Sequence, residues 1–148
     1  MNRPGAPLLS AEQHELAATA RPWVENLLHT HADQRDRRDM VGLGTSLAGA
    51  ILRFGDSEPG FGAAAVTHTY GTLLRADDRT QHLVSNLIVT AGDPARVTTS
   101  AAYTRWTPDP APALASVGAH LSESAIDGGH WRFTAHKVRR DWFLEPQR

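Results

Sequence analysis

Apolar residues recur at helical spacing in the first third of the chain. They lie three or four residues apart, as on one face of an amphipathic helix. These positions are Leu16, Ala17, Ala20, Val24, Leu27 and Leu28. The string Ser10-Ala-Glu-Gln13 just before them is a capping box, which satisfies free N–H groups at a helix start. Because Pro22 lacks the helical N–H donor, we predict helical structure over residues 10–31 with a break near Pro22.

The middle of the chain changes character twice. Residues 31–39 (HADQRDRRD) are polar and predict an exposed connection. Residues 41–50 combine glycines with small apolar side chains and predict a short helix that leads into a strand over residues 50–54. After a turn at residues 55–60, helical spacing returns and predicts a second, short helix over residues 61–75.

From Arg79 onward the hydrophobic period is two, which is typical of strands. Turn residues such as Asp127-Gly-Gly separate the apolar runs. The predicted strands cover residues 81–90, 95–107, 114–126 and 130–142. Helices followed by strands joined mainly by hairpins predict an α+β fold, with a curved antiparallel sheet and helices on one face. The order lacks the βαβ alternation of a Rossmann-type domain.

Composition narrows the class of protein. The 148 residues suit one domain, with residues 1–8 as a flexible leader. The formal net charge of −1 lacks the basic footprint of a nucleic-acid binder, and no apolar run approaches the roughly 20 residues of a membrane span. The first residues contain no apolar segment, so we expect no signal peptide. The absence of cysteine excludes disulfides and thiolate ligands and fits a cytoplasmic protein.

One histidine stands at the head of an apolar run, in the string RTQHLVSN. Alternate residues of a strand share a face, so His82, Val84 and Asn86 are expected to point the same way. A histidine and an amide on a mostly apolar face are typical of a ligand pocket, and an imidazole exchanges protons near neutral pH. The alternative is that His82 and Asn86 satisfy each other or the backbone inside the core.

Several other side chains are candidates for binding a substrate. Tyr103 and Arg105 share a strand face, and Arg105 is predicted either to hold an oxyanion or to lie in solvent. His120 faces either a pocket or solvent. Trp131 and Phe133 form an apolar face, predicted to be core or ligand platform. On the opposite, polar face we expect Arg132, Thr134 and His136.

No spacing in the sequence indicates a metal site. His29 and His31 diverge by about 200° on a helix, which makes them a poor metal pair. Asp33, Asp36 and Asp39 alternate with arginines, and such a run is usually a solvated surface. Asp39 is also a candidate N-cap for the helix after it.

Four strings together resemble the SnoaL-like branch of the nuclear-transport-factor-2-like superfamily. The resemblance covers residues 15–142 and implies a cone, in which a bent, cystatin-like sheet wraps around the N-terminal helix and encloses a pocket. The strings are Asp36-Arg-Arg-Asp39, Arg79-Thr-Gln-His82, Ala91-Gly-Asp-Pro-Ala95 and Asp127-Gly-Gly-His-Trp-Arg-Phe133.

The Arg79-Thr-Gln-His82 string also resembles that of scytalone dehydratases. This resemblance implies that His82 is the acid/base and that Asp36 orients it, with Asp33 as the alternative. Those enzymes have a second histidine, and the position in this sequence that corresponds to it lies near Arg105.

The resemblance implies an acid/base enzyme without cofactor or metal: a cyclase, dehydratase or isomerase for a hydrophobic polyketide-like or aromatic metabolite. The alternatives are an epoxide-opening enzyme and a non-catalytic ligand-binding or accessory subunit. Apolar residues on both strand faces predict a homodimer. The expected catalytic residues are His82 and Asp36. The expected substrate-binding residues are Asn86, Tyr103, Arg105, His120, Trp131 and Phe133.

Overall fold

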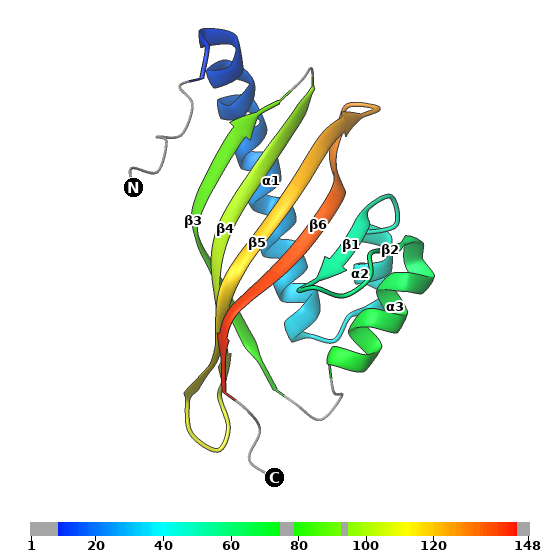
Figure 1. The fold of residues 1–148 in the computed structure, drawn as a ribbon, viewed down its shortest axis with the longest axis vertical. Coiled ribbons are helices and arrows are strands. Elements are labelled where there is room, and N and C mark those ends of the chain that lie inside the picture. The colour runs from blue at the N-terminus through cyan, green and yellow to red at the C-terminus, as the bar shows by residue number, and fades with distance from the viewer. Residues whose placement is uncertain (1–8, 75–78, 93–94, 145–148) are drawn as a thin grey trace.

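The computed structural model describes residues 9–74, 79–92 and 95–144 (Figure 1). The predicted leader at residues 1–8, and Asp93 and Pro94 of the predicted turn, lie outside the described residues. The helices are α1 (Ala11–Asp36), α2 (Met40–Ser46) and α3 (Gly62–Leu73). The strands are β1 (Ile51–Phe54), β2 (Gly60–Phe61), β3 (Gln81–Ala91), β4 (Arg96–Thr107), β5 (Ala113–Asp127) and β6 (His130–Phe143). All the predicted strands are present, and the two-residue β2 was not predicted.

The strands form one mixed sheet in the order β2-β1-β6-β5-β4-β3. Neighbouring strands are antiparallel except β1 and β6, which are parallel. Helix α1 runs along one face of the long strands, while α2 and α3 lie beside β1 (Figure 1). The α+β prediction, with a curved sheet around the N-terminal helix, is therefore confirmed.

Irregular pairing bends the sheet at four places. The register shifts between Ser85 and Ile88 in β3, beside Arg105 in β4, and twice along the β5–β6 pair. A β-bulge inserts a residue, bends its strand and increases the local twist. Beyond each bulge the strand presents the opposite set of residues to the helix, and this decides which polar side chains enter the interior.

Helix α1 is continuous through Pro22, so the predicted break is wrong. Ser10 and Gln13 form the predicted capping box at its start. One stripe of buried residues continues on both sides of Pro22, and tertiary packing of such a stripe supplies most of a helix's stability in a protein. The helix also reaches Asp36, five residues beyond its predicted end.

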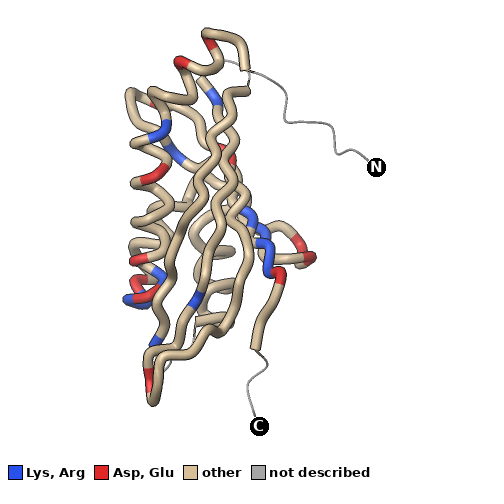
Figure 2. Tube along the Cα trace, turned by 90° about the vertical axis from the view of Figure 1, so that its left-hand side faces the viewer, with Lys and Arg blue, Asp and Glu red and all other residues tan. Residues whose placement is uncertain are grey.

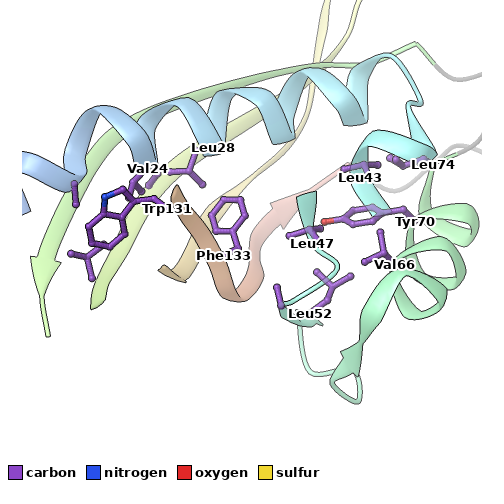
Figure 3. Packing of buried hydrophobic residues seen from close by; sticks show 14 residues of the cluster. Val24, Leu28, Leu43, Leu47, Leu52, Val66, Tyr70, Leu74, Trp131 and Phe133 are labelled. Atoms are coloured by element: carbon purple, nitrogen blue, oxygen red, sulfur yellow. The ribbon is translucent and has the colours of Figure 1, made fainter. Parts of the chain in front are cut away.

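The apolar core has two parts, which Figure 3 shows side by side. Near the middle of α1, Val24 and Leu28 lie close to Trp131 and Phe133 of β6. The second part lies around α2 and α3, and its labelled members are Leu43, Leu47, Leu52, Val66, Tyr70 and Leu74. His31 contacts both parts, because its ring lies 5.7 Å from the Tyr70 ring and 6.4 Å from the Phe133 ring.

Charged residues are concentrated on α1 and toward the ends of the strands (Figure 2). Strand β3 carries none. Within the described ranges, no helix is both long and apolar enough to cross a membrane.

Candidate functional site

The last residue of α1 and the second residue of β3 form a carboxylate–imidazole pair. Asp36 Oδ1 lies 2.5 Å from His82 Nδ1, and Asp36 Oδ2 accepts the backbone N–H of His82 at 2.8 Å. The side chain of His82 is fully buried, and that of Asp36 is one fifth exposed. One carboxylate thus holds both the ring and the backbone of His82.

Thr80 and Arg38 hold the same carboxylate from the outside. The Thr80 hydroxyl donates to Asp36 Oδ1 at 3.0 Å and accepts from Arg38 Nη1 at 2.9 Å. Arg38, the second residue after α1, has a positive φ of 58°, and its guanidinium also donates to the Arg35 carbonyl at 2.6 Å. The end of α1 and the start of β3 are therefore tied together at the pair.

The pair has one preferred protonation state at neutral pH. Burial is the main cause that lowers the pKa of His82, to about 4, although the hydrogen bond to Asp36 opposes it. Partial burial opposes ionisation of Asp36, but the bonds from His82 and Thr80 lower its pKa overall. Ionised Asp36 can only accept, so the proton of neutral His82 lies on Nδ1 and the lone pair lies on Nε2.

His82 Nε2 is buried and has no hydrogen-bond partner. The ring of Tyr103 lies 6.2 Å from that of His82 and 4.9 Å from that of His120. Gly118 makes room for Tyr103, since a Cβ at that position would lie 2.7 Å from Tyr103 Cε1. The basic nitrogen of His82 therefore faces an interior lined by aromatic rings.

Three further histidines are buried in this interior, and we call them the histidine cluster: His31 of α1, His120 of β5 and His136 of β6. His120 Nδ1 lies 3.2 Å from His136 Nε2, and His136 Nδ1 lies 2.9 Å from the Ser122 hydroxyl. His31 Nε2 lies 3.1 Å from the Tyr70 hydroxyl. Burial lowers the pKa of all three and brings that of His136 to about 3, so the cluster is neutral at pH 7.

The cluster has the donor set of a metal site, since one nitrogen of each histidine lies within 4.8 Å of the others. Three neutral imidazoles suit zinc, copper or iron. The charge of Arg35, however, acts on all three imidazoles and lowers their pKa. The same charge repels a divalent cation. The three imidazoles therefore favour a metal ion, and the charge of Arg35 disfavours it.

Arg35 is the only charged residue of α1 that is buried among the described residues, with 4% of its surface exposed. Its Nε and Nη1 atoms have no hydrogen-bond partner. The guanidinium carbon lies 5.4 Å from the centre of the Tyr70 ring. A cation therefore stands beside the histidine cluster with two donors unused.

The other predicted residues differ in how deeply they are buried. Tyr103, His120, Trp131 and Phe133 are all buried, and Phe133 packs against His136 at 5.1 Å between ring centres. Arg105 is half-buried opposite His82 in the β3–β4 register, and it donates to the Ser116 hydroxyl at 3.2 Å. Asp33 lines the same surface hollow as Asp36 and His82, but its carboxylate pairs with Arg37. Asp39 caps α2 as predicted.

Asn86 does not share the face of His82, and that expectation is wrong. The β3 bulge lies at Asn86, whose φ is +52°, and it turns the amide into solvent. Leu87 and Val89 take the inward positions beyond the bulge and pack on the core. Asn86 instead lines a small surface hollow beside Arg21 and Glu25 of α1.

Sequence reasoning missed the inward positions of His31, Arg35 and His136. Thr134 is the extra residue of a bulge, so His136 faces inward with Trp131 and Phe133 instead of outward with Arg132. A single sequence carries no consistent signal for such a bulge. The helical spacing of Val24, Leu28, His31 and Arg35 did contain the signal for the other two.

Chemically, the arrangement suits proton abstraction. A neutral imidazole with a fixed tautomer, held by an ionised carboxylate, is the geometry of a general base. The Nε2 atom of His82 is buried without a partner, the Tyr103 ring lies 6.2 Å from the His82 ring, and the charge of Arg35 acts on the His82 ring.

Solved structures of low sequence identity share this fold. A putative scytalone dehydratase from Novosphingobium aromaticivorans DSM 12444 has a TM-score of 0.74 at 11% identity, covering 90% of this chain and 92% of that chain. A hexachlorocyclohexane dehydrochlorinase, LinA-type3 from Novosphingobium barchaimii LL02, has a TM-score of 0.74 at 14% identity over 88% and 92%. The beta subunit of a putative aromatic-ring-hydroxylating dioxygenase from N. aromaticivorans has a TM-score of 0.72 at 13% identity over 87% and 94%.

Sequence comparison gives the family. No curated protein sequence matches the chain. Residues 17–137, which are most of the chain, match the model of the SnoaL-like domain. The resemblance seen in the four sequence strings is thereby confirmed, and the chain belongs to the SnoaL-like domain family.

Proposed function

We propose that this protein is an acid/base enzyme that removes a proton from a hydrophobic metabolite, leading to elimination, cyclisation or isomerisation. The observation that carries the proposal is the Asp36–His82 pair, in which Nδ1 is held at 2.5 Å while the buried Nε2 has no partner. Membership of a fold that includes a putative dehydratase and a dehydrochlorinase agrees with a lyase-type reaction.

In this proposal His82 Nε2 takes a proton from a carbon next to an electron-withdrawing group. Asp36 stays ionised and stabilises the imidazolium that forms, as the carboxylate of a catalytic triad does. The electron pair of the broken C–H bond then expels a leaving group, attacks an internal electrophile, or returns to another carbon with the proton. These outcomes correspond to dehydration or dehydrohalogenation, cyclisation, and isomerisation.

We infer the substrate class from the residues packed beside the histidines. The aromatic rings of Tyr70, Tyr103 and Phe133 lie next to them, and such rings favour a flat apolar ligand. An aromatic or polyketide-like metabolite fits such walls. Epoxide opening by a water that His82 deprotonates uses the same base and is the neighbouring alternative.

A probe that needs only a base tests the proposal without the natural substrate. In 5-nitrobenzisoxazole a base removes the ring C–H proton, the electron pair forms a nitrile, and the N–O bond breaks to release a coloured nitrophenolate. We expect the wild-type protein to catalyse this elimination about 100-fold faster than the His82→Gln variant, the usual minimum for a positioned general base.

The matched control is His29→Gln, which removes an exposed histidine from α1 and should leave the rate unchanged. Equal rates for the wild type and His82→Gln, with both proteins folded, would contradict the proposed role of His82.

A second candidate is a non-catalytic binding or accessory subunit. The similarity to the beta subunit of a putative aromatic-ring-hydroxylating dioxygenase favours it. In that case an aromatic ligand should bind equally well to the wild type and to His82→Gln, and neither should accelerate the elimination.

The expected homodimer is part of the proposal. Leu83 and Ile88 point away from the core, with 52% and 62% of their surfaces exposed, and an uncharged strand carries both. Covering them with a second copy removes that apolar surface from water. Light scattering should give the mass of a dimer for the wild type and a smaller mass for Ile88→Lys; a monomeric wild type would contradict this.

A further inference from the structure

Arg35 is a buried cation that has no counter-ion among the described residues. None of the ion pairs among the described residues includes it, and two of its guanidinium nitrogens have no hydrogen-bond partner. The neighbouring carboxylate of Asp36 accepts from His82 and Thr80 instead. An unpaired charge in the interior is costly, and proteins normally pair it or bind something to it.

We propose that the interior binds an organic anion, a carboxylate or a phenolate or enolate oxygen, at the guanidinium of Arg35. The N–H donors at Nε and Nη1 are buried and unused, so an anionic oxygen bound there gains charge-assisted hydrogen bonds. The same anion supplies the negative counter-charge that Arg35 lacks among the described residues.

The surroundings specify the rest of the ligand. The Tyr70 ring packs against the guanidinium at 5.4 Å, and its hydroxyl is already engaged by His31. Phe133 lies beside His31 and His136. A compact anionic group attached to an aromatic or apolar body matches one cation surrounded by rings.

The charges around Arg35 favour a negatively charged ligand. The four buried histidines are neutral at pH 7 and add no positive charge, while Arg35 lowers the pKa of each of them. Arg35 takes part in none of the ion pairs among the described residues, so its charge favours an anion over a metal ion.

This inference deepens the proposed function and, for its catalytic consequence, rests on it. Proton removal by His82 next to a carbonyl leaves negative charge on oxygen. Arg35 would stabilise that oxygen while Asp36 stabilises the imidazolium, so the two halves of the separated charge would each have a partner.

Benzoate and benzamide form a matched pair of probes, because they differ in charge and little in shape. Isothermal titration should show that the wild type binds benzoate at least about tenfold more tightly than benzamide, as expected for a hydrogen bond to a charged group. Arg35→Gln should abolish this preference. The control Arg37→Gln, which removes an exposed arginine paired with Asp33, should keep it.

A stability measurement keeps the inference testable if Arg35→Gln binds nothing or unfolds. Arg35→Met removes the unpaired charge and retains an apolar side chain, so it should raise the thermal unfolding midpoint of the free protein. A purely structural arginine would give the opposite sign.

Three results would overturn the anion site: equal binding of benzoate and benzamide, a benzoate preference that survives in Arg35→Gln, or stabilisation of the wild type by Zn²⁺ and not by benzoate. If benzoate preference is absent while His82→Gln still abolishes elimination, only this inference is wrong. If the preference is present and the His82 effect is absent, the binding site stands and the proposed enzyme does not.

Discussion

The interior contains two kinds of buried histidine, and they differ in their partners. His82 has an ionised carboxylate on one nitrogen and nothing on the other. No carboxylate among the described residues bonds to the histidine cluster, and its members bond to one another, to Tyr70 and to Ser122. Burial depresses the pKa of both kinds. His31 Nδ1 is also buried without a partner, so the feature that sets His82 apart is the ionised carboxylate that fixes its tautomer.

The largest expected effect comes from exchanging the two kinds of histidine for glutamine. His82→Gln should lower the elimination rate about 100-fold or more, whereas His136→Gln should stay close to the wild type. The wild-type rate should be constant near neutral pH and fall as acid protonates His82, around pH 4. An equal loss of rate in both variants would show that His82 and the histidine cluster do not differ in function.

Asp36→Asn should produce the next largest loss. An amide can donate to His82 Nδ1, which moves the ring proton to Nε2 and removes the lone pair from the interior. We expect the rate to fall about tenfold or more. Asp33→Asn removes an exposed carboxylate from the same helix and should leave the rate unaltered; a drop of similar size there would point to general damage to α1.

Gly118→Ala tests the packing of Tyr103, whose ring is near both His82 and His120. The added Cβ would collide with the Arg139 carbonyl and would lie 2.7 Å from Tyr103 Cε1. Overpacking of this kind should lower the free energy of unfolding by about 1–3 kcal/mol and displace the ring beside His82. Gly71→Ala, in α3 with open space around the new Cβ, should instead stabilise by about 0.5–1 kcal/mol. Denaturant unfolding measures both.

The last effect appears only in acid and concerns the histidine cluster. The pKa of His136 falls from 6.5 to about 3 on folding, so between these values the unfolded chain binds more protons. The stability of the folded state should therefore fall as pH drops through this window, by up to about 1.4 kcal/mol per pH unit for each such histidine. His136→Gln should make the slope shallower by at most that amount, and His29→Gln should not change it.

The regular parts of the chain were predictable and the irregular parts were not. The capping box, the strands and the Gly128-Gly129 turn follow from local patterns, and both turn glycines have the positive φ that this tight hairpin requires. His82 lies before the first bulge of β3, so alternation places it correctly. Asn86 and His136 lie at or beyond bulges, where alternation gives the wrong face.

The prediction for the end of α1 was wrong for a different reason. Charge density suggested a solvated connection, yet the helix continues and buries His31 and Arg35 on its packed stripe. The contact of Asp36 with His82 came from family resemblance, because no local pattern links residues 46 positions apart. The histidine cluster joins three elements of the fold, so no sequence spacing could reveal it.

The most direct test is the protonation state of His82. Long-range ¹H–¹⁵N NMR of ¹⁵N-labelled protein, with His82→Gln to assign the signal, distinguishes the two ring nitrogens. We expect a proton on Nδ1 and an unprotonated Nε2 at pH 7, with titration near pH 4. A proton on Nε2, or a charged imidazolium at pH 7, would contradict it.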